Sequence, residues 1–170
     1  MYSDPRSDIV DTMLRQRARI LGPARESWGG PKMRAFGGGG GANERALAKP
    51  GEDLFVGSYN QSYRANAAQA RAAGKTTSDH TPHHSVQDAV SPLTHSRGVT
   101  INMRKDLHAL TRTFRNPNVP ELSLRSHLAR DVQDIKGILR GAGYDSGTVR
   151  TQLRELIRQN KAAWEGAGKL

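Results

Sequence analysis

The chain has 170 residues, with 26 Lys or Arg against 16 Asp or Glu, and its formal net charge is +10 with histidine neutral. A hydrophobic content of 35% is enough for one modest core and argues against a second large domain. The chain has no cysteine, which excludes disulfides, thiolate zinc sites and a cysteine nucleophile. The positive charge favours a polyanionic partner, and nucleic acid is the first candidate.

No membrane span or secretion signal is expected. No apolar run approaches the roughly 20 residues that cross a bilayer, and the N-terminus lacks the charged-then-apolar order of a signal peptide. We therefore expect that, if the protein is exported, a separate apparatus carries it.

The first 51 residues are predicted to be a lead-in rather than part of the folded domain. Apolar residues at near-helical spacing predict a short amphipathic helix over 8–21, which Gly22-Pro23 ends. The segment 28–51, with five consecutive glycines, has the composition of a flexible linker. The domain is expected to occupy residues 52–170.

The middle of the chain predicts one helix, one strand and a second helix. An alanine-rich stretch, 62–73, favours a helix that stops at Gly74. The sequence "RGVTINM" is rich in β-branched residues and predicts a strand over 99–103. In "RKDLHALTRTF", apolar residues at helical spacing predict a helix over 104–114.

Two longer helices are predicted near the C-terminus. Apolar residues mark one helical face between 120 and 141 and another between 147 and 165, and "GAGYDSG" separates them as a turn. We expect these helices to form a hairpin over 121–165. The predicted class is α+β: a mostly helical domain around a small strand–strand–helix unit at about 78–115.

The segment from Ser78 to Phe114 is the candidate for chemistry. Asp79 and His80 are adjacent, so in an extended backbone their side chains point to opposite faces. One can bind a metal while the other faces a water, and His108 on the predicted helix can supply a second ligand.

This pattern resembles the His-Me finger nucleases (HNH and endonuclease VII), in particular the toxin domains of bacterial polymorphic toxin systems. "DHTP" is similar to the start of their ββα-metal motif, and "GVTINMRKDLHALTRTF" to its second strand and helix. The resemblance implies His80 as the general base, with Asp79 and His108 as metal ligands. It implies that Asn102 orients the base through a hydrogen bond.

An alternative assignment uses the adjacent pair His83-His84, which many related toxins carry. In it His83 is the metal ligand and His84 the base. The first assignment has the hard oxygen ligand that Mg²⁺ prefers, so Mg²⁺ is the expected cofactor, with Mn²⁺, Zn²⁺ or Ni²⁺ as alternatives. The remaining histidines, His95 and His127, are interpreted as bystanders.

Basic residues surround the predicted strand and second helix, and they are expected to bind the phosphates on either side of the cleaved bond. They are Arg97, Arg104, Lys105, Arg112 and Arg115.

The resemblance implies an antibacterial toxin that hydrolyses phosphodiester bonds, with DNA preferred to RNA. It would be delivered by a contact-dependent or injection system, act in the target-cell cytoplasm, and be neutralised by an acidic immunity protein. Three alternatives stay open: a non-catalytic nucleic-acid-binding module, a toxin of another chemistry (a metal-free ribonuclease using His80 and His108, or an ADP-ribosyltransferase), and an adaptor whose histidines bind zinc.

Overall fold

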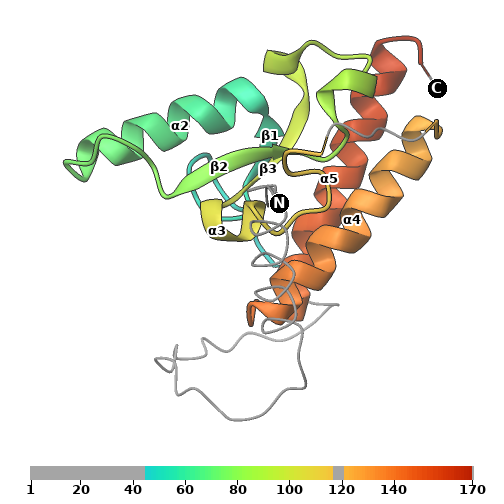
Figure 1. The fold of residues 1–170 in the computed structure, drawn as a ribbon. Coiled ribbons are helices and arrows are strands. Elements are labelled where there is room, and N and C mark those ends of the chain that lie inside the picture. The colour runs from blue at the N-terminus through green and yellow to red at the C-terminus, as the bar shows by residue number, and fades with distance from the viewer. Residues whose placement is uncertain (1–44, 117–120, 170) are drawn as a thin grey trace, which may run out of the picture. The chain divides into compact units, whose positions relative to one another are not determined.

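A computed structural model describes residues 45–116 and 121–169 (Figure 1). The helix predicted over 8–21 and most of the predicted linker lie outside the described residues.

The centre of the fold is a three-stranded antiparallel sheet in the order β1-β3-β2. The strands are β1 (Val56–Ser58), β2 (His80–His84) and β3 (Val99–Arg104). β3 confirms the strand predicted from its β-branched residues, and it is the central strand. β2 lies at one edge of the sheet and pairs with β3 from His80↔Arg104 to His84↔Thr100.

Helix α2 (Tyr59–Ala72) covers one face of the sheet (Figure 1). It begins three residues before the predicted start, because Ser58 and Gln61 form a capping box that satisfies the first backbone N–H groups. Buried polar contacts fix α2 to β3: Ser62 Oγ lies 3.2 Å from Thr100 Oγ1, and the amides of Asn66 and Asn102 bond to each other. Residues 100 and 102 therefore face α2.

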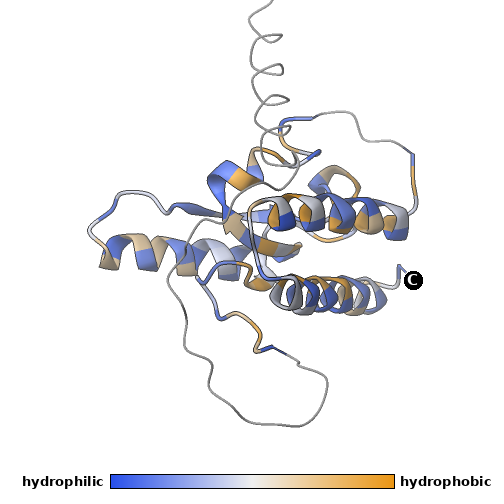
Figure 2. Ribbon diagram, turned by 90° about the horizontal axis from the view of Figure 1, so that it is seen from below, coloured by the Kyte–Doolittle hydropathy of each residue, from blue (hydrophilic) through white to orange (hydrophobic). Residues whose placement is uncertain are grey.

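Helix α5 (Ser146–Gly166) packs against β1 and β3, and α4 (Leu124–Gly141) lies beside α5. Both helices were expected, with nearly these bounds, and each carries a hydrophobic and a hydrophilic stripe (Figure 2). Their hydrophobic stripes supply eight of the 18 buried hydrophobic core residues that the structure describes, among them Ile135, Ile138, Leu139, Leu153, Leu156 and Trp164. The described part of the chain is therefore α+β, as predicted.

Two shorter elements complete the fold. The β2–β3 connection contains two 3₁₀ turns, η1 (Asp88–Val90) and η2 (His95–Arg97). The helix predicted over 104–114 is wrong in length, since α3 covers only Lys105–His108. The backbone N–H of Arg112 donates to Asp134 Oδ2 on α4, at 2.6 Å, instead of continuing the helical ladder.

Candidate functional site

The histidines of β2 are divided between the two faces of the sheet. Side chains alternate along a strand, so His80 and His84 lie on the face that α2 covers, together with their β3 partners. His83 pairs with Ile101 and lies on the opposite face. The strand that carries three candidate histidines therefore separates them into two groups.

His83 meets His108 on that opposite face. His83 is 3% exposed, and its ring lies edge-on to the ring of His108, with centroids 5.1 Å apart. Phe114 contacts His108 from another side, at 5.2 Å. Burial lowers the pKa of His83 to about 3 and also lowers the pKa of His108, so both imidazoles are neutral at pH 7. Neutral imidazoles keep the lone pairs that a metal needs.

His84 is held in place by the β2–β3 connection and by α2. Its Nε2 lies 3.0 Å from the carbonyl oxygen of His95, and its ring stacks on Tyr59 with centroids 5.1 Å apart. A Cβ on Gly98 would come within 2.8 Å of the His84 ring, so glycine makes room for it. Burial lowers the pKa of His84. In the neutral ring, Nε2–H donates to the carbonyl, and the lone pair stays on Nδ1.

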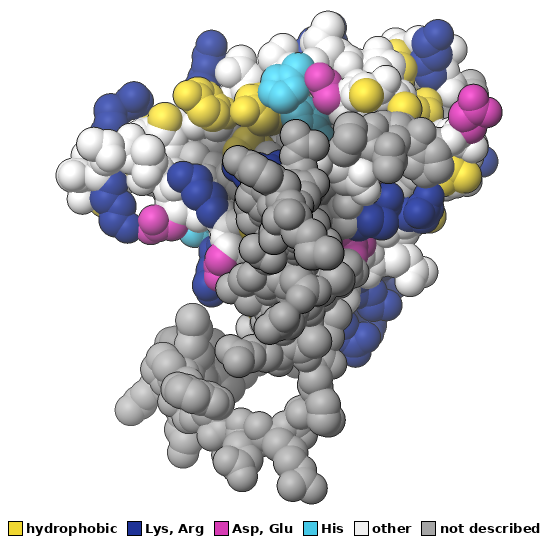
Figure 3. Space-filling view, in the orientation of Figure 1, with side chains coloured by type: hydrophobic (Ala, Val, Ile, Leu, Met, Phe, Trp, Pro, Cys, Tyr) yellow, Lys and Arg dark blue, Asp and Glu magenta, His cyan; other side chains and the backbone are white. Residues whose placement is uncertain are grey.

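His84, Asp88 and His95 could hold a metal ion, since one ligand atom from each lies within 4.8 Å of the others. Among the described residues, no other set of three or more His, Cys, Asp or Glu side chains meets this condition. In Figure 3, histidine side chains lie at the surface beside an acidic side chain, next to hydrophobic side chains over α2. His95 was interpreted as a bystander, and no periodic pattern in the connection signals its approach to His84.

Asp79 and His80 do not join His108. The exposed carboxylate of Asp79 pairs with Lys75, which lowers the pKa of Asp79. His80 Nε2 lies 3.6 Å from Asp53 Oδ1, and Asp53 also accepts a hydrogen bond from the Tyr144 hydroxyl. The residues of the first assignment, Asp79 and His80, therefore contact other partners, and it is His83 that contacts His108.

Asn102 is fully buried and has a different role from the expected one. It exchanges hydrogen bonds of 2.7 and 3.0 Å with Asn66, and its Nδ2 donates to the carbonyl oxygens of Gly51 and Glu52. These contacts bind α2 and the start of the domain to β3. The carbonyl of His95, not the side chain of Asn102, is the group that orients a histidine.

Of the five predicted phosphate-binding residues, some are engaged in contacts within the protein and others are exposed without an ion pair. Arg104 pairs with Asp106, and Arg112 pairs at 2.6 Å with the buried carboxylate of Asp131. Arg115 lies over the Phe114 ring at 5.2 Å. Arg97 and Lys105 are exposed, and no ion pair is found for either among the described residues.

A groove of about 410 Å³ lies between α2 and β2. Its lining includes Tyr59, Tyr63, Arg71, His80 and Lys105. The rings of Tyr59 and Tyr63 are nearly parallel, with centroids 6.0 Å apart, and Tyr63 is 56% exposed. The groove thus combines stacked aromatic rings with cations, although aromatic residues are only 5% of the chain.

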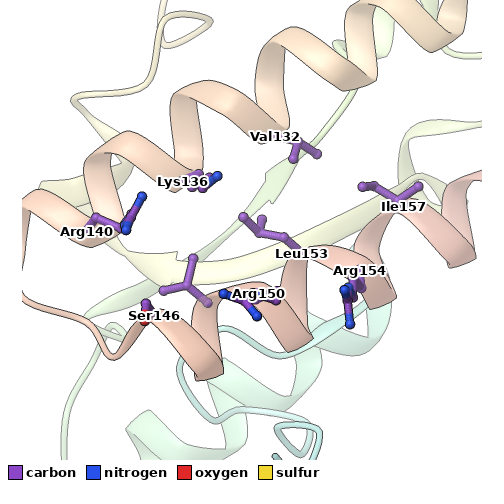
Figure 4. Close-up of a pocket in the computed structure, with 9 residues that line it drawn as sticks. Val132, Lys136, Arg140, Ser146, Arg150, Leu153, Arg154 and Ile157 are labelled. Carbon is purple, nitrogen blue, oxygen red and sulfur yellow. The ribbon is translucent and has the colours of Figure 1, made fainter. Parts of the chain in front are cut away.

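A second groove, of about 220 Å³, lies between α4 and α5 (Figure 4). Its apolar lining includes Val132, Leu153 and Ile157. Four cations also line it: Lys136, Arg140, Arg150 and Arg154. Sequence reasoning missed this group because its members lie on two helices and converge only when the helices pack.

No family model, curated protein or solved structure matches the chain. None of the helices in the described residues is both long and apolar enough to cross a membrane.

Proposed function

We propose that this protein is a metal-dependent nuclease in which His84 is the general base and His83 and His108 hold the metal. The observation that carries the proposal is the contact of His83 with His108. Two antiparallel strands followed by a short helix bring these residues together from β2 and α3, and that is the order of elements in the family that the sequence resembles.

His84 fits the role of base. The hydrogen bond from Nε2 to the His95 carbonyl orients the ring and leaves the Nδ1 lone pair to take a proton from water. β2 is the edge strand of the sheet, so no strand pairs with its outer side, and we propose that a phosphate approaches His84 from there. When bound, a divalent ion would stabilise the charge that develops on the phosphoryl oxygens.

The ligand set bears on the choice of metal. Two imidazoles suit Zn²⁺ or Ni²⁺ better than Mg²⁺, which prefers oxygen ligands. The expected oxygen ligand, Asp79, pairs with Lys75 instead. We therefore propose a transition metal in place of Mg²⁺ at His83 and His108.

The biological part of the proposal follows from the resemblance: a toxin domain acting on DNA in a target cell, delivered by a carrier and inhibited by an acidic immunity protein. The groove between α4 and α5 supports the acidic partner, because four cations line it together with apolar side chains. An amphipathic acidic segment would match both features.

The purified chain tests the catalytic proposal when it is incubated with plasmid DNA or total RNA, with Zn²⁺, Ni²⁺, Mn²⁺ or Mg²⁺, or with EDTA. We expect cleavage that requires a divalent ion and stops with EDTA. Cleavage that persists in EDTA would instead indicate a metal-free ribonuclease.

A non-catalytic nucleic-acid-binding module is the second candidate, and the groove between α2 and β2 favours it. Stacked tyrosines and nearby cations are the features that bind single strands through base stacking and phosphate contacts. This candidate predicts salt-sensitive binding to single-stranded DNA or RNA and no cleavage with any of the four ions.

A further inference from the structure

We propose that His84, Asp88 and His95 form a second metal site, which binds a transition-metal ion such as Zn²⁺. This site is separate from the pair His83 and His108, because His84 lies on the other face of β2. The binding step does not depend on the proposed nuclease activity.

The spacing of the donor atoms matches a metal site. Zinc bonds of about 2.0–2.2 Å in a tetrahedron put neighbouring ligand atoms roughly 3.3–3.6 Å apart. His95 Nδ1 and Asp88 Oδ2 are 3.3 Å apart, which is long for a charge-assisted hydrogen bond of about 2.7–2.9 Å. The third donor lies within 4.8 Å. Rotation of the exposed side chains of Asp88 and His95 can close the remaining distance.

The surroundings prepare His84 to be a ligand. A metal-bound histidine usually donates its other ring N–H to a carbonyl or carboxylate, and the His95 carbonyl accepts from Nε2 here. The ring of Tyr59 contacts both histidines. It stacks on His84, and it is tilted against His95, with the Tyr59 and His95 ring centroids 4.2 Å apart. The two histidine rings thus share one support, and their own centroids are 4.7 Å apart.

The ligand types select the metal. Two imidazoles and one carboxylate suit Zn²⁺, Co²⁺ or Ni²⁺, whereas Mg²⁺ and Ca²⁺ prefer oxygen-only sets. Three protein ligands leave a fourth position for water. A bound ion would also join β2 to both 3₁₀ turns, and so fix the connection between β2 and β3.

A regulatory consequence follows, and this step rests on the proposed function. An ion in this site uses the His84 lone pair that the general base needs, so occupancy would stop catalysis. Occupancy of this second site by Zn²⁺ would therefore inhibit cleavage, whereas binding at His83 and His108 would activate it.

The binding step is tested with the untagged full chain by Co²⁺ absorption spectroscopy and by Zn²⁺ titration calorimetry. We expect Asp88→Ala and His95→Ala each to weaken binding at this site on the order of tenfold or more. The matched control His80→Ala changes a histidine on the same face of the same strand and should bind as the wild type does. His108→Ala should retain this site. If Asp88→Ala and His95→Ala bind as tightly as the wild type, or if only His108→Ala loses binding, the proposed site is wrong.

The regulatory step has a separate readout. Excess Zn²⁺ should inhibit cleavage by the wild type but inhibit Asp88→Ala only at a concentration about tenfold higher. Equal inhibition of both proteins would contradict the regulatory step. Zn²⁺ binding at this site without cleavage in Zn²⁺, Ni²⁺, Mn²⁺ or Mg²⁺, by the wild type or by Asp88→Ala, would contradict the proposed nuclease and leave the metal site established.

Discussion

His83 and His108 lie edge to face with ring centroids 5.1 Å apart, one on strand β2 and the other at the end of helix α3. Burial lowers the pKa of both rings and keeps them neutral. Among the described residues, no third His, Asp or Glu side chain joins this pair in a metal-binding group. The contact therefore favours His83-His84 over Asp79-His80 as the functional pair.

The first prediction separates these two assignments. We expect His84→Ala and His108→Ala to lower kcat/KM for plasmid cleavage on the order of 10²–10⁴-fold, the usual contribution of a general base or a metal ligand. His80→Ala should stay within a few-fold of the wild type, because His80 contacts Asp53 and lies on the face of β2 opposite to His83 and His108. If His80→Ala instead lowers the single-turnover rate far more than His84→Ala does, the first assignment, with His80 as the base, is correct.

The second prediction concerns the room that Gly98 gives to the His84 ring. Its φ of −54° suits any residue, so Gly98→Ala introduces no backbone strain and adds only a Cβ within 2.8 Å of the ring. The displaced ring should lose its bond to the His95 carbonyl, and cleavage should fall about tenfold. The ring resonances of His84 in NMR spectra would report the displacement directly.

Gly137 on α4 offers a matched control for that substitution. A Cβ at Gly137 would meet nothing within 4 Å, so Gly137→Ala should leave cleavage unchanged. It should raise the free energy of unfolding by about 0.5–1 kcal/mol, because alanine is the better helix former. Equal losses of cleavage in both variants would show that the effect at Gly98 is not specific to His84.

The sequence predicts the elements whose patterns are local. α4 and α5 carry their own hydrophobic stripes, and β3 carries its own β-branched run, so all three are found close to their expected bounds. β1 has only three residues and exists through its pairing with β3, which no local pattern reveals. α3 ends at His108, and beyond it the N–H of Arg112 bonds to Asp134 on a distant helix, a tertiary contact that no local pattern reveals.

The candidate site follows the same division. The sequence indicates the segment and the candidate residues His83, His84 and His108, because histidines beside a predicted strand and helix are a local pattern. The placement of His95 was not, since its approach to His84 depends on how the β2–β3 connection folds against Tyr59. The role of Asn102 also depends on a tertiary partner, Asn66.

The third prediction uses the buried His83 as a source of acid sensitivity. Its folded-state pKa of about 3 lies below the unfolded value of 6.5, so its contribution is fully present above pH 6.5 and is lost as pH falls toward 3. Between pH 7 and pH 5 this loss is about 2 kcal/mol. Glutamine at position 83 cannot titrate. In urea unfolding, the free energy of unfolding of His83→Gln should therefore decrease from pH 7 to pH 5 by about 2 kcal/mol less than that of the wild type. Equal decreases in the two proteins would mean that His83 is not held neutral.

The last prediction decides whether Arg112 binds phosphate or supports the fold. Burial raises the pKa of Asp131 to about 7, and the ion pair with Arg112 opposes that rise. Arg112→Met leaves the buried carboxyl of Asp131 without its partner, so the free energy of unfolding should fall by about 3 kcal/mol at pH 9, where the wild-type carboxyl is ionised, and by less at pH 7. The unpaired carboxyl has a folded-state pKa above its unfolded value, so this loss should shrink toward pH 5 as Asp131 takes up a proton.

A second variant isolates the unpaired charge. Arg112→Met combined with Asp131→Asn removes that charge and should recover much of the loss at pH 9, with little dependence on pH. If Arg112→Met instead unfolds at the wild-type urea concentration and only its affinity for DNA falls, Arg112 acts on phosphate as the sequence suggests. In that case Asp131 would stay neutral in the folded protein up to pH 9, because only a protonated carboxyl tolerates burial without a cation.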